Sequence, residues 1–241
     1  MEKNEQYYID LAWKNQDVKI LSQYYFRKSL TPRQEILVRK ITFHEEKNIW
    51  RMAVSAMTRW GKSYCVTIGI GLYLIKSTNK SIPFIGPTGD QAMILRDYMT
   101  ELVINCDFLL RHSDIELKGI ERIKKEASKK RMTFTSMNNE YRVFSAEGDA
   151  ERLMGHGVGS GGGIIVKDEA VLINDVANAK IGRMAGDKPK GVLIIELFNP
   201  WNRDNKVHEH ISDPNWDYTH VGWKDAIEDG RTTKEFVDEQ R

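Results

Sequence analysis

The chain has little cysteine, no long hydrophobic run and almost no net charge. Among its 241 residues only Cys65 and Cys106 are cysteines, too few for a disulfide scaffold, which favours a reducing, intracellular setting. The most apolar run, residues 65–75, is shorter than the roughly 20 residues of a membrane-spanning helix, and the N-terminus lacks the charge pattern of a signal peptide. We therefore expect a soluble, cytoplasmic protein with no membrane partner.

The formal net charge of +2 gives no strong whole-molecule argument for binding nucleic acid. Basic side chains are dense only in residues 118–131, where seven lysines and arginines are diluted by two glutamates. Two interpretations of this segment remain open: a solvated, exposed turn, or a surface that contacts DNA.

What is present is typical of a globular protein, with 41% hydrophobic and 29% charged residues. This length can bury the core of one large α/β domain, with a small appendage. Apolar runs at residues 49–56, 81–85, 164–166 and 192–195 predict buried strands, and helical spacing marks the first forty residues, residues 64–74 and residues 91–110. Runs at residues 131–134 and 141–144 around Asn138-Asn139 predict a hairpin. Together they indicate a mostly parallel sheet flanked by helices, with an antiparallel edge.

A phosphate-binding loop is predicted between the first strand and the apolar helix that follows it. Such a loop needs inward-pointing backbone N–H groups, a lysine for the β- and γ-phosphate oxygens, and a hydroxyl for magnesium. Ala56 stands where the motif GxxxxGK[ST] has its first glycine, so the loop must begin in a conformation that tolerates a Cβ. The candidate nucleotide-binding residues are Ala56, Met57, Thr58, Arg59, Trp60, Gly61, Lys62 and Ser63.

Two carboxylates follow the predicted strand at residues 164–166. Magnesium bound to phosphate takes few protein ligands, so one carboxylate at the end of a buried strand is sufficient, and Asp168 fits that role together with Ser63. Glu169 then suits the general base that orients and deprotonates the attacking water. The loop and the acidic pair together predict hydrolysis of a nucleotide, with ATP and Mg²⁺ as ligands.

Three further residues have a functional and a structural interpretation, and both stay open. Arg59 is either a cation that stabilises charge at the γ-phosphate or a surface arginine of the loop. Asn199 is either a sensor of the γ-phosphate or part of an Asn-Pro turn that ends a strand. Gln34 either pairs with adenine or completes a capping box with Thr31 at the start of a helix.

These motifs, in this order and spacing, resemble the ATPase domain of the large terminase subunit, the motor that packs DNA into the heads of tailed phages. The segments that carry the resemblance are Thr31-Pro32-Arg33-Gln34, residues 57–63, residues 85–88, residues 152–155, residues 164–170 and residues 198–200. The resemblance implies a RecA/ASCE-type P-loop fold. It also implies roles for Gln34 at adenine, Lys62 and Ser63 at phosphate and magnesium, Asp168 at magnesium, Glu169 as base and Asn199 in coupling.

The resemblance further suggests that Arg152 is an arginine finger that completes a neighbouring subunit's site, against the alternative of an arginine in a glycine-rich loop. In the family the basic residue of the loop often lies one place earlier, at Thr58 here. The implied partners are double-stranded DNA, other copies in a ring on the portal, the portal protein and the small terminase subunit, in the host cytoplasm at the procapsid.

The expected organisation is an ATPase core over residues 1–205 and a lid or linker subdomain over residues 206–241. The family's C-terminal nuclease is not expected in this sequence, which resembles a fragment. Two alternatives stand beside a packaging motor: a fragment of a RecA-like helicase or translocase, and a nucleotide-gated DNA-binding module without turnover.

Overall fold

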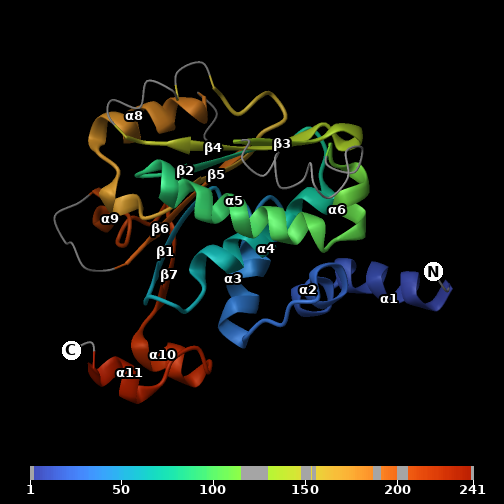
Figure 1. Cartoon of the computed structure of the whole chain (residues 1–241), viewed down its shortest axis with the longest axis horizontal. Helices are drawn as coiled ribbons and strands as arrows, with labels where there is room; N and C mark the ends of the chain where they lie inside the picture. Colours follow the sequence, from blue (N-terminus) through green and yellow to red (C-terminus); the bar gives the residue numbers. More distant parts are fainter. Residues whose placement is uncertain are drawn as a thin grey trace.

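Seven strands form one sheet in the order β3-β4-β2-β5-β6-β1-β7 (Figure 1). The computed structural model describes residues 3–114, 130–147, 153, 156–186, 191–199 and 206–239. The strands are β1 (Arg51–Ala56), β2 (Ser81–Gly86), β3 (Arg131–Phe134), β4 (Asn139–Ser145), β5 (Gly163–Lys167), β6 (Val192–Phe198) and β7 (Asp217–Val221). The described helices are α1 (Lys3–Lys14), α2 (Val18–Phe26), α3 (Pro32–Thr42), α4 (Lys62–Lys76), α5 (Gly89–Ile104), α6 (Asp107–His112), α8 (Asp175–Met184), α9 (Lys206–Glu209), α10 (Trp223–Glu228) and α11 (Lys234–Glu239), with short 3₁₀ turns η2 (Thr135–Met137) and η4 (Ala170–Leu172).

The strands run parallel except β3, which pairs antiparallel with β4 at one edge of the sheet. Because parallel strands end at the same edge, the segments that follow β1, β5, β6 and β7 meet there. β6 lies between β1 and β5. The predicted phosphate loop and the predicted acidic pair are therefore separated by one strand, and Asn199 follows that strand.

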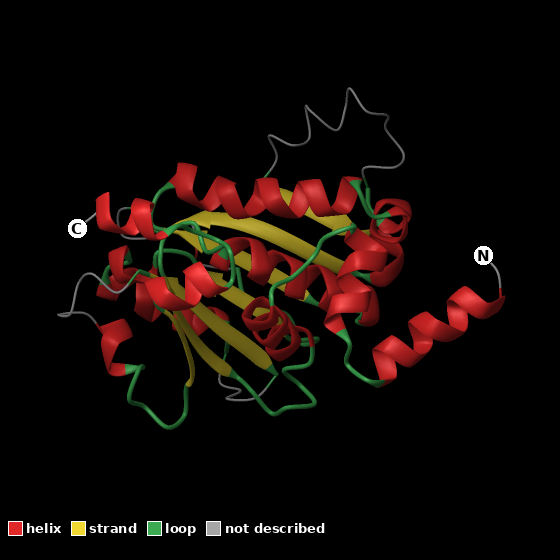
Figure 2. Ribbon diagram, turned by 90° about the horizontal axis from the view of Figure 1, so that it is seen from below, coloured by secondary structure: helices red, strands yellow, loops and turns green. Residues whose placement is uncertain are grey.

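The central strands β1, β2, β5 and β6 are almost wholly buried, and this burial on both faces of the sheet explains why they read as continuous apolar runs. Successive side chains of β5 point to opposite faces: Ile164 and Val166 join the core beneath α1 to α6, whereas Ile165 joins a second core with Ile181 and Met184 of α8. Figure 2 shows the sheet between helices, with α1 projecting from one end of the molecule. The predicted α/β class and mostly parallel sheet are confirmed.

A buried ion pair explains how Lys167 is accommodated at the end of β5. Its ammonium pairs with Glu196 of the neighbouring strand β6, and it donates to Asn178 Oδ1 at 3.1 Å. His210 lies 2.7 Å from the other Glu196 oxygen. Burial opposes ionisation of Glu196, yet the His210 bond and the Lys167 charge hold its pKa below the ordinary range. The charge that interrupts the apolar run is thus neutralised inside the sheet.

The predicted hairpin is confirmed as β3 and β4, joined through η2, and Asn138 in its turn has a positive φ of 52°. Asn139, however, belongs to β4 and is buried.

The sequence predicts one continuous helix over residues 91–110, whereas the structure has two separate helices there, α5 and α6. Asn105 bonds the Glu101 carbonyl through its side chain, and Cys106 is extended, so α5 ends and α6 begins as a separate helix.

The last strand, β7, was not predicted because Asp217, Thr219 and His220 give it no apolar run. It pairs along β1, from Met52↔Asp217 to Ala56↔Val221. The central sheet thus extends into the residue range 206–241 that the sequence suggests as a lid, and α10 and α11 follow beyond the end of β7 (Figure 1). In the part of the chain that the structure describes, no helix combines the length and apolarity needed to cross a membrane.

Candidate nucleotide site

The predicted phosphate loop joins β1 to α4 at the carboxyl edge of the sheet. Ala56 is the last residue of β1 and pairs with Val221, so it has the extended backbone in which a Cβ is tolerated. Gly61 precedes α4 with a left-handed φ of 98°, and a Cβ there would lie 3.4 Å from Gln34 Nε2. Lys62 and Ser63 therefore begin α4, where the positive end of the helix dipole and unpaired N–H groups favour an anion.

Lys62, Glu169 and Asn199 meet at this edge although each follows a different strand. Lys62 Nζ donates to Asn199 Oδ1 at 2.9 Å and to Glu169 Oε1 at 3.2 Å. Asn199 Nδ2 also donates to Glu169 Oε1, at 3.3 Å. Among the described residues Lys62 therefore uses two of its three N–H donors on these partners. The cluster brings together a cation, a carboxylate and an amide at the start of a helix.

The Glu169 side chain is anchored by one oxygen only. Its Oε1 accepts the bonds from Lys62 and Asn199, whereas its buried Oε2 has no hydrogen-bond partner within the residues that the structure describes. Glu169 also has a left-handed φ of 44°, an uncommon conformation for a side chain without turn propensity. Such backbone strain is often found at functional sites. Within the described residues, one oxygen of the carboxylate is thus bonded and the other is not.

Asp168 and Ser63 form a second polar pair beside this cluster. Ser63 Oγ lies 3.5 Å from Asp168 Oδ1, and the Asp168 side chain is almost fully buried after β5. Burial raises the pKa of Asp168 to about 6; the Lys62 charge opposes this effect and the Glu169 charge adds to it. A hydroxyl and one poorly solvated carboxylate match the donor set of Mg²⁺ that keeps waters and phosphate oxygens as its other ligands. These two residues fit the magnesium site predicted for them.

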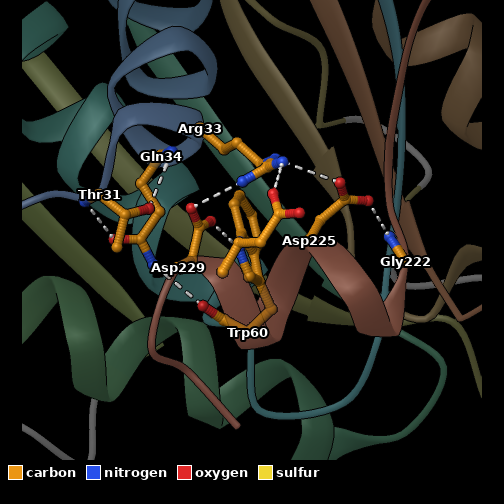
Figure 3. Close-up of polar contacts among 8 residues, drawn as sticks. Thr31, Arg33, Gln34, Trp60, Gly222, Asp225 and Asp229 are labelled. Carbon is orange, nitrogen blue, oxygen red and sulfur yellow. Dashed lines mark hydrogen bonds and ion pairs between the residues drawn. The ribbon is translucent and has the colours of Figure 1, made fainter.

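Gln34 completes the capping box predicted at the start of α3. Thr31 Oγ1 accepts from the Gln34 backbone N–H at 3.4 Å, and Gln34 Oε1 accepts from the Thr31 N–H at 3.1 Å. The same amide also reaches the phosphate loop, donating from Nε2 to the Trp60 carbonyl at 3.0 Å (Figure 3). Arg231 donates a further bond to Gln34 Oε1 at 2.7 Å. Gln34 thus contacts the loop whether or not it contacts a base.

The remaining loop residues line a pocket of about 630 Å³ beside the cluster. Its walls come from the loop, the end of β6 and the C-terminal segment: Met57, Thr58, Arg59, Asn199, His220, Val221, Gly222, Trp223, Phe236 and Val237. The Arg59 guanidinium stacks over Phe236 of α11, 4.7 Å from the ring centroid. Arg152 and most of the basic segment at residues 118–131 lie outside the described residues.

Sequence reasoning missed the C-terminal contacts of the loop. Trp60 Nε1 donates to Asp229 Oδ2 at 2.8 Å, and Arg33 pairs with the same carboxylate through its other oxygen at 3.1 Å. Arg231 and Phe236 also come from this segment. In the sequence, Asp229, Arg231 and Phe236 lie in a charged C-terminal segment that is predicted to be helical and contains no motif.

Solved structures of known proteins share this fold, although no protein-family model matches the sequence and no curated protein does. Three of them are the large terminase of a thermophilic bacteriophage, the ATPase domain of the Thermus phage P74-26 large terminase, and the large terminase of bacteriophage HK97. Their TM-scores are 0.59, 0.59 and 0.57 at 12%, 17% and 20% sequence identity.

The chain has the fold of a large terminase ATPase domain. The P74-26 ATPase domain matches over 83% of this chain and 86% of its own length. The thermophilic-phage and HK97 terminases match over 88% and 80% of this chain but 50% and 39% of their own lengths. This chain thus spans about half of the thermophilic-phage terminase, and the terminase fold agrees with the resemblance that the sequence motifs carry.

Proposed function

We propose that the chain is the ATP-hydrolysing domain of a viral DNA-packaging motor of the large terminase type. The observation that carries the proposal is the meeting of Lys62, Glu169 and Asn199 at the start of α4, since these residues come from three motifs far apart in the sequence. The thermophilic-phage terminase, which shares the fold, has been crystallised with ADP and with ATP-gamma-S. Those complexes support a nucleotide as the ligand of this chain.

Each residue of the cluster has a distinct role in this proposal. Lys62 turns an N–H toward the β- and γ-phosphates, which the backbone N–H groups at the start of α4 also hold. Ser63 and Asp168 hold Mg²⁺, which when bound neutralises charge on the phosphate oxygens. Glu169 accepts the proton of the attacking water through Oε2. Asn199, bonded to both Lys62 and Glu169, transmits the state of the γ-phosphate to the chain after β6.

The two arginines have separate proposed roles. Arg59 lies in the loop and stacks on Phe236, so its guanidinium stays beside the pocket that Asn199 also lines. There it can stabilise charge that develops on the phosphates in the transition state. Arg152 acts in trans as an arginine finger in the neighbouring subunit's site, a role that the family resemblance supports.

The partners proposed for the motor follow from its type. They are double-stranded DNA, further copies of the chain in a ring, the portal protein and the small terminase subunit, in the host cytoplasm at the procapsid portal. Residues 206–241 act as the lid or linker. These assignments rest on the terminase fold together with the residues of the cluster.

Release of phosphate from ATP tests the proposed chemistry directly. The whole chain, at high protein concentration to favour assembly, should release phosphate with Mg²⁺ and lose that activity when EDTA removes the metal. Addition of double-stranded DNA is expected to raise the rate. Release that is indistinguishable from a protein-free blank, with and without DNA, would contradict an ATPase and favour a nucleotide-gated binding module.

A further inference from the structure

The phosphate loop is held from two sides, by Gln34 of α3 and by Asp229 of the turn that follows α10. Trp60 is buried in the loop, and its indole N–H donates to Asp229, a carboxylate whose side chain is only 2% exposed (Figure 3). The other Asp229 oxygen accepts from Arg33 of α3. One buried carboxylate therefore connects the loop, α3 and the turn after α10.

A second connection joins the same three segments through the Gln34 amide. Its Nε2 donates to the Trp60 carbonyl, while its Oε1 accepts from both Thr31 and Arg231. An amide oxygen has two acceptor lone pairs, so Oε1 is fully used by the chain itself. An adenine amino group that needed this oxygen would have to displace Thr31 or Arg231. The amide is thus directed at the loop and the C-terminal turn.

Arg33 fastens the C-terminal turn to α3. Its guanidinium contacts three carboxylates: Asp225 at 3.0 Å, Glu228 at 2.6 Å and Asp229 at 3.1 Å. Asp225 also accepts from the Gly222 N–H at 2.9 Å, at the point where β7 leads into α10 (Figure 3). The turn that holds Trp60 is consequently fixed to the helix that carries Gln34.

The loop segment between these contacts has a backbone that needs support. Arg59 and Gly61, on either side of Trp60, have left-handed φ values of 71° and 98°. Such a conformation is unfavourable for arginine and persists where the surroundings hold it. Trp60 is held by its indole and by its carbonyl, and Arg59 is held by Phe236. The contacts therefore lie on the residues whose conformation sets the direction of the loop N–H groups.

We propose that Trp60, Gln34, Asp229 and Arg231 are positioning residues for nucleotide binding. They hold the phosphate loop in its anion-binding shape from the C-terminal turn, and Gln34 acts through the loop instead of reading the base. The proposal rests on nucleotide binding at Lys62. It implies that loss of any of these contacts weakens ATP and GTP by the same factor, because only the phosphate end of the ligand is affected.

Equilibrium binding of fluorescent ATP and GTP analogues to the whole chain tests this. Trp60→Phe removes the indole donor and keeps an aromatic ring, and Asp229→Asn keeps the size of the side chain. Since each removes a buried bond involving a charged carboxylate, we expect about tenfold weaker binding of both nucleotides. The double variant should be little worse than either single variant. Gln34→Ala should weaken both nucleotides equally.

The structure offers a matched control at the opposite end of β1. Trp50 Nε1 donates to Asn48 Oδ1 at 2.9 Å, so Trp50→Phe removes the same kind of donor away from the loop and should leave both affinities unchanged. Amide hydrogen exchange of residues 57–61 should rise in Asp229→Asn, whereas exchange within β1 should not. If Trp60→Phe does not fold, Arg231→Lys serves as the second probe of the same contacts.

The outcomes separate this proposal from the proposed function. If Lys62→Ala abolishes nucleotide binding while the Trp60 and Asp229 variants bind like the wild type, the positioning role is overturned and the nucleotide site stands. If Gln34→Ala weakens ATP and spares GTP, Gln34 reads the base and that part of the proposal fails. If the wild-type chain binds neither nucleotide, the proposed function itself fails.

Discussion

Replacement of Glu169 by glutamine should lower the rate of ATP turnover by about 10²–10⁴-fold, the usual contribution of a positioned general base. Glutamine keeps the length of the side chain and can still accept from Lys62 and Asn199 through its amide oxygen. It cannot take a proton from water at neutral pH. Nucleotide affinity should therefore change little while phosphate release is lost, which is measured by single-turnover hydrolysis beside equilibrium binding.

Glu209→Gln provides the matched control for this variant. Glu209 is an exposed carboxylate of α9, and removal of its charge should leave turnover unchanged. Turnover of Glu169→Gln equal to that of the wild type would remove Glu169 from the chemistry. If neither the wild type nor Glu169→Gln turns over ATP although both bind the nucleotide tightly, the result would favour the nucleotide-gated binding module that the sequence leaves open.

Replacement of Asp168 by asparagine should stabilise the protein and abolish its magnesium-dependent activity. The pKa of Asp168 is raised to about 6 because burial removes water from its carboxylate, so its ionised form is unfavourable in the folded chain. With about 1.4 kcal/mol for each pH unit of pKa difference, the ionised carboxylate costs the folded state about 1–3 kcal/mol. Asparagine removes that cost but also removes the anionic ligand for Mg²⁺.

The gain in stability should depend on pH in one direction. Because the pKa of Asp168 is raised in the folded state, the folded chain keeps this proton at pH values where the unfolded chain has lost it. The free energy of unfolding of the wild type should therefore fall as pH rises from about 4, the ordinary aspartate pKa, through about 6. The two proteins should differ least below this window and most above it. Chemical denaturation at pH 4 and pH 8 measures the difference, and equal stabilities at pH 8 would contradict a buried, desolvated Asp168.

The parts of the fold that were predictable are those in which one physical signal dominates. The runs that became β5 and β6 are buried on both faces and hence continuously apolar. The capping box of Thr31 and Gln34 depends on two residues three places apart, so spacing alone predicts it. The gathering of Lys62, Asp168, Glu169 and Asn199 at one edge follows from the parallel order of the strands that precede them.

The contacts around Trp60 were not predictable because they depend on tertiary structure. Trp60 and Asp229 are separated by 169 residues, and neither lies in a spacing pattern that selects the other. The sequence also gives no sign of β7, whose polar side chains stand on an edge strand, although β7 carries the chain to the turn that holds the loop. The contacts of Gln34 with Arg231 and of Arg59 with Phe236 were not predictable for the same reason, because both partners lie in that C-terminal segment.

A crystal structure of the whole chain with Mg²⁺ and a non-hydrolysable ATP analogue would show whether the nucleotide and the metal bind at the start of α4. We predict the γ-phosphate within hydrogen-bond distance of Lys62 Nζ, Mg²⁺ between Ser63 and Asp168, and a water beside Glu169 Oε2. Gln34 should keep its bond to the Trp60 carbonyl. Phosphates that lie away from the start of α4, or a metal that Asp168 does not approach, would contradict the proposed nucleotide site.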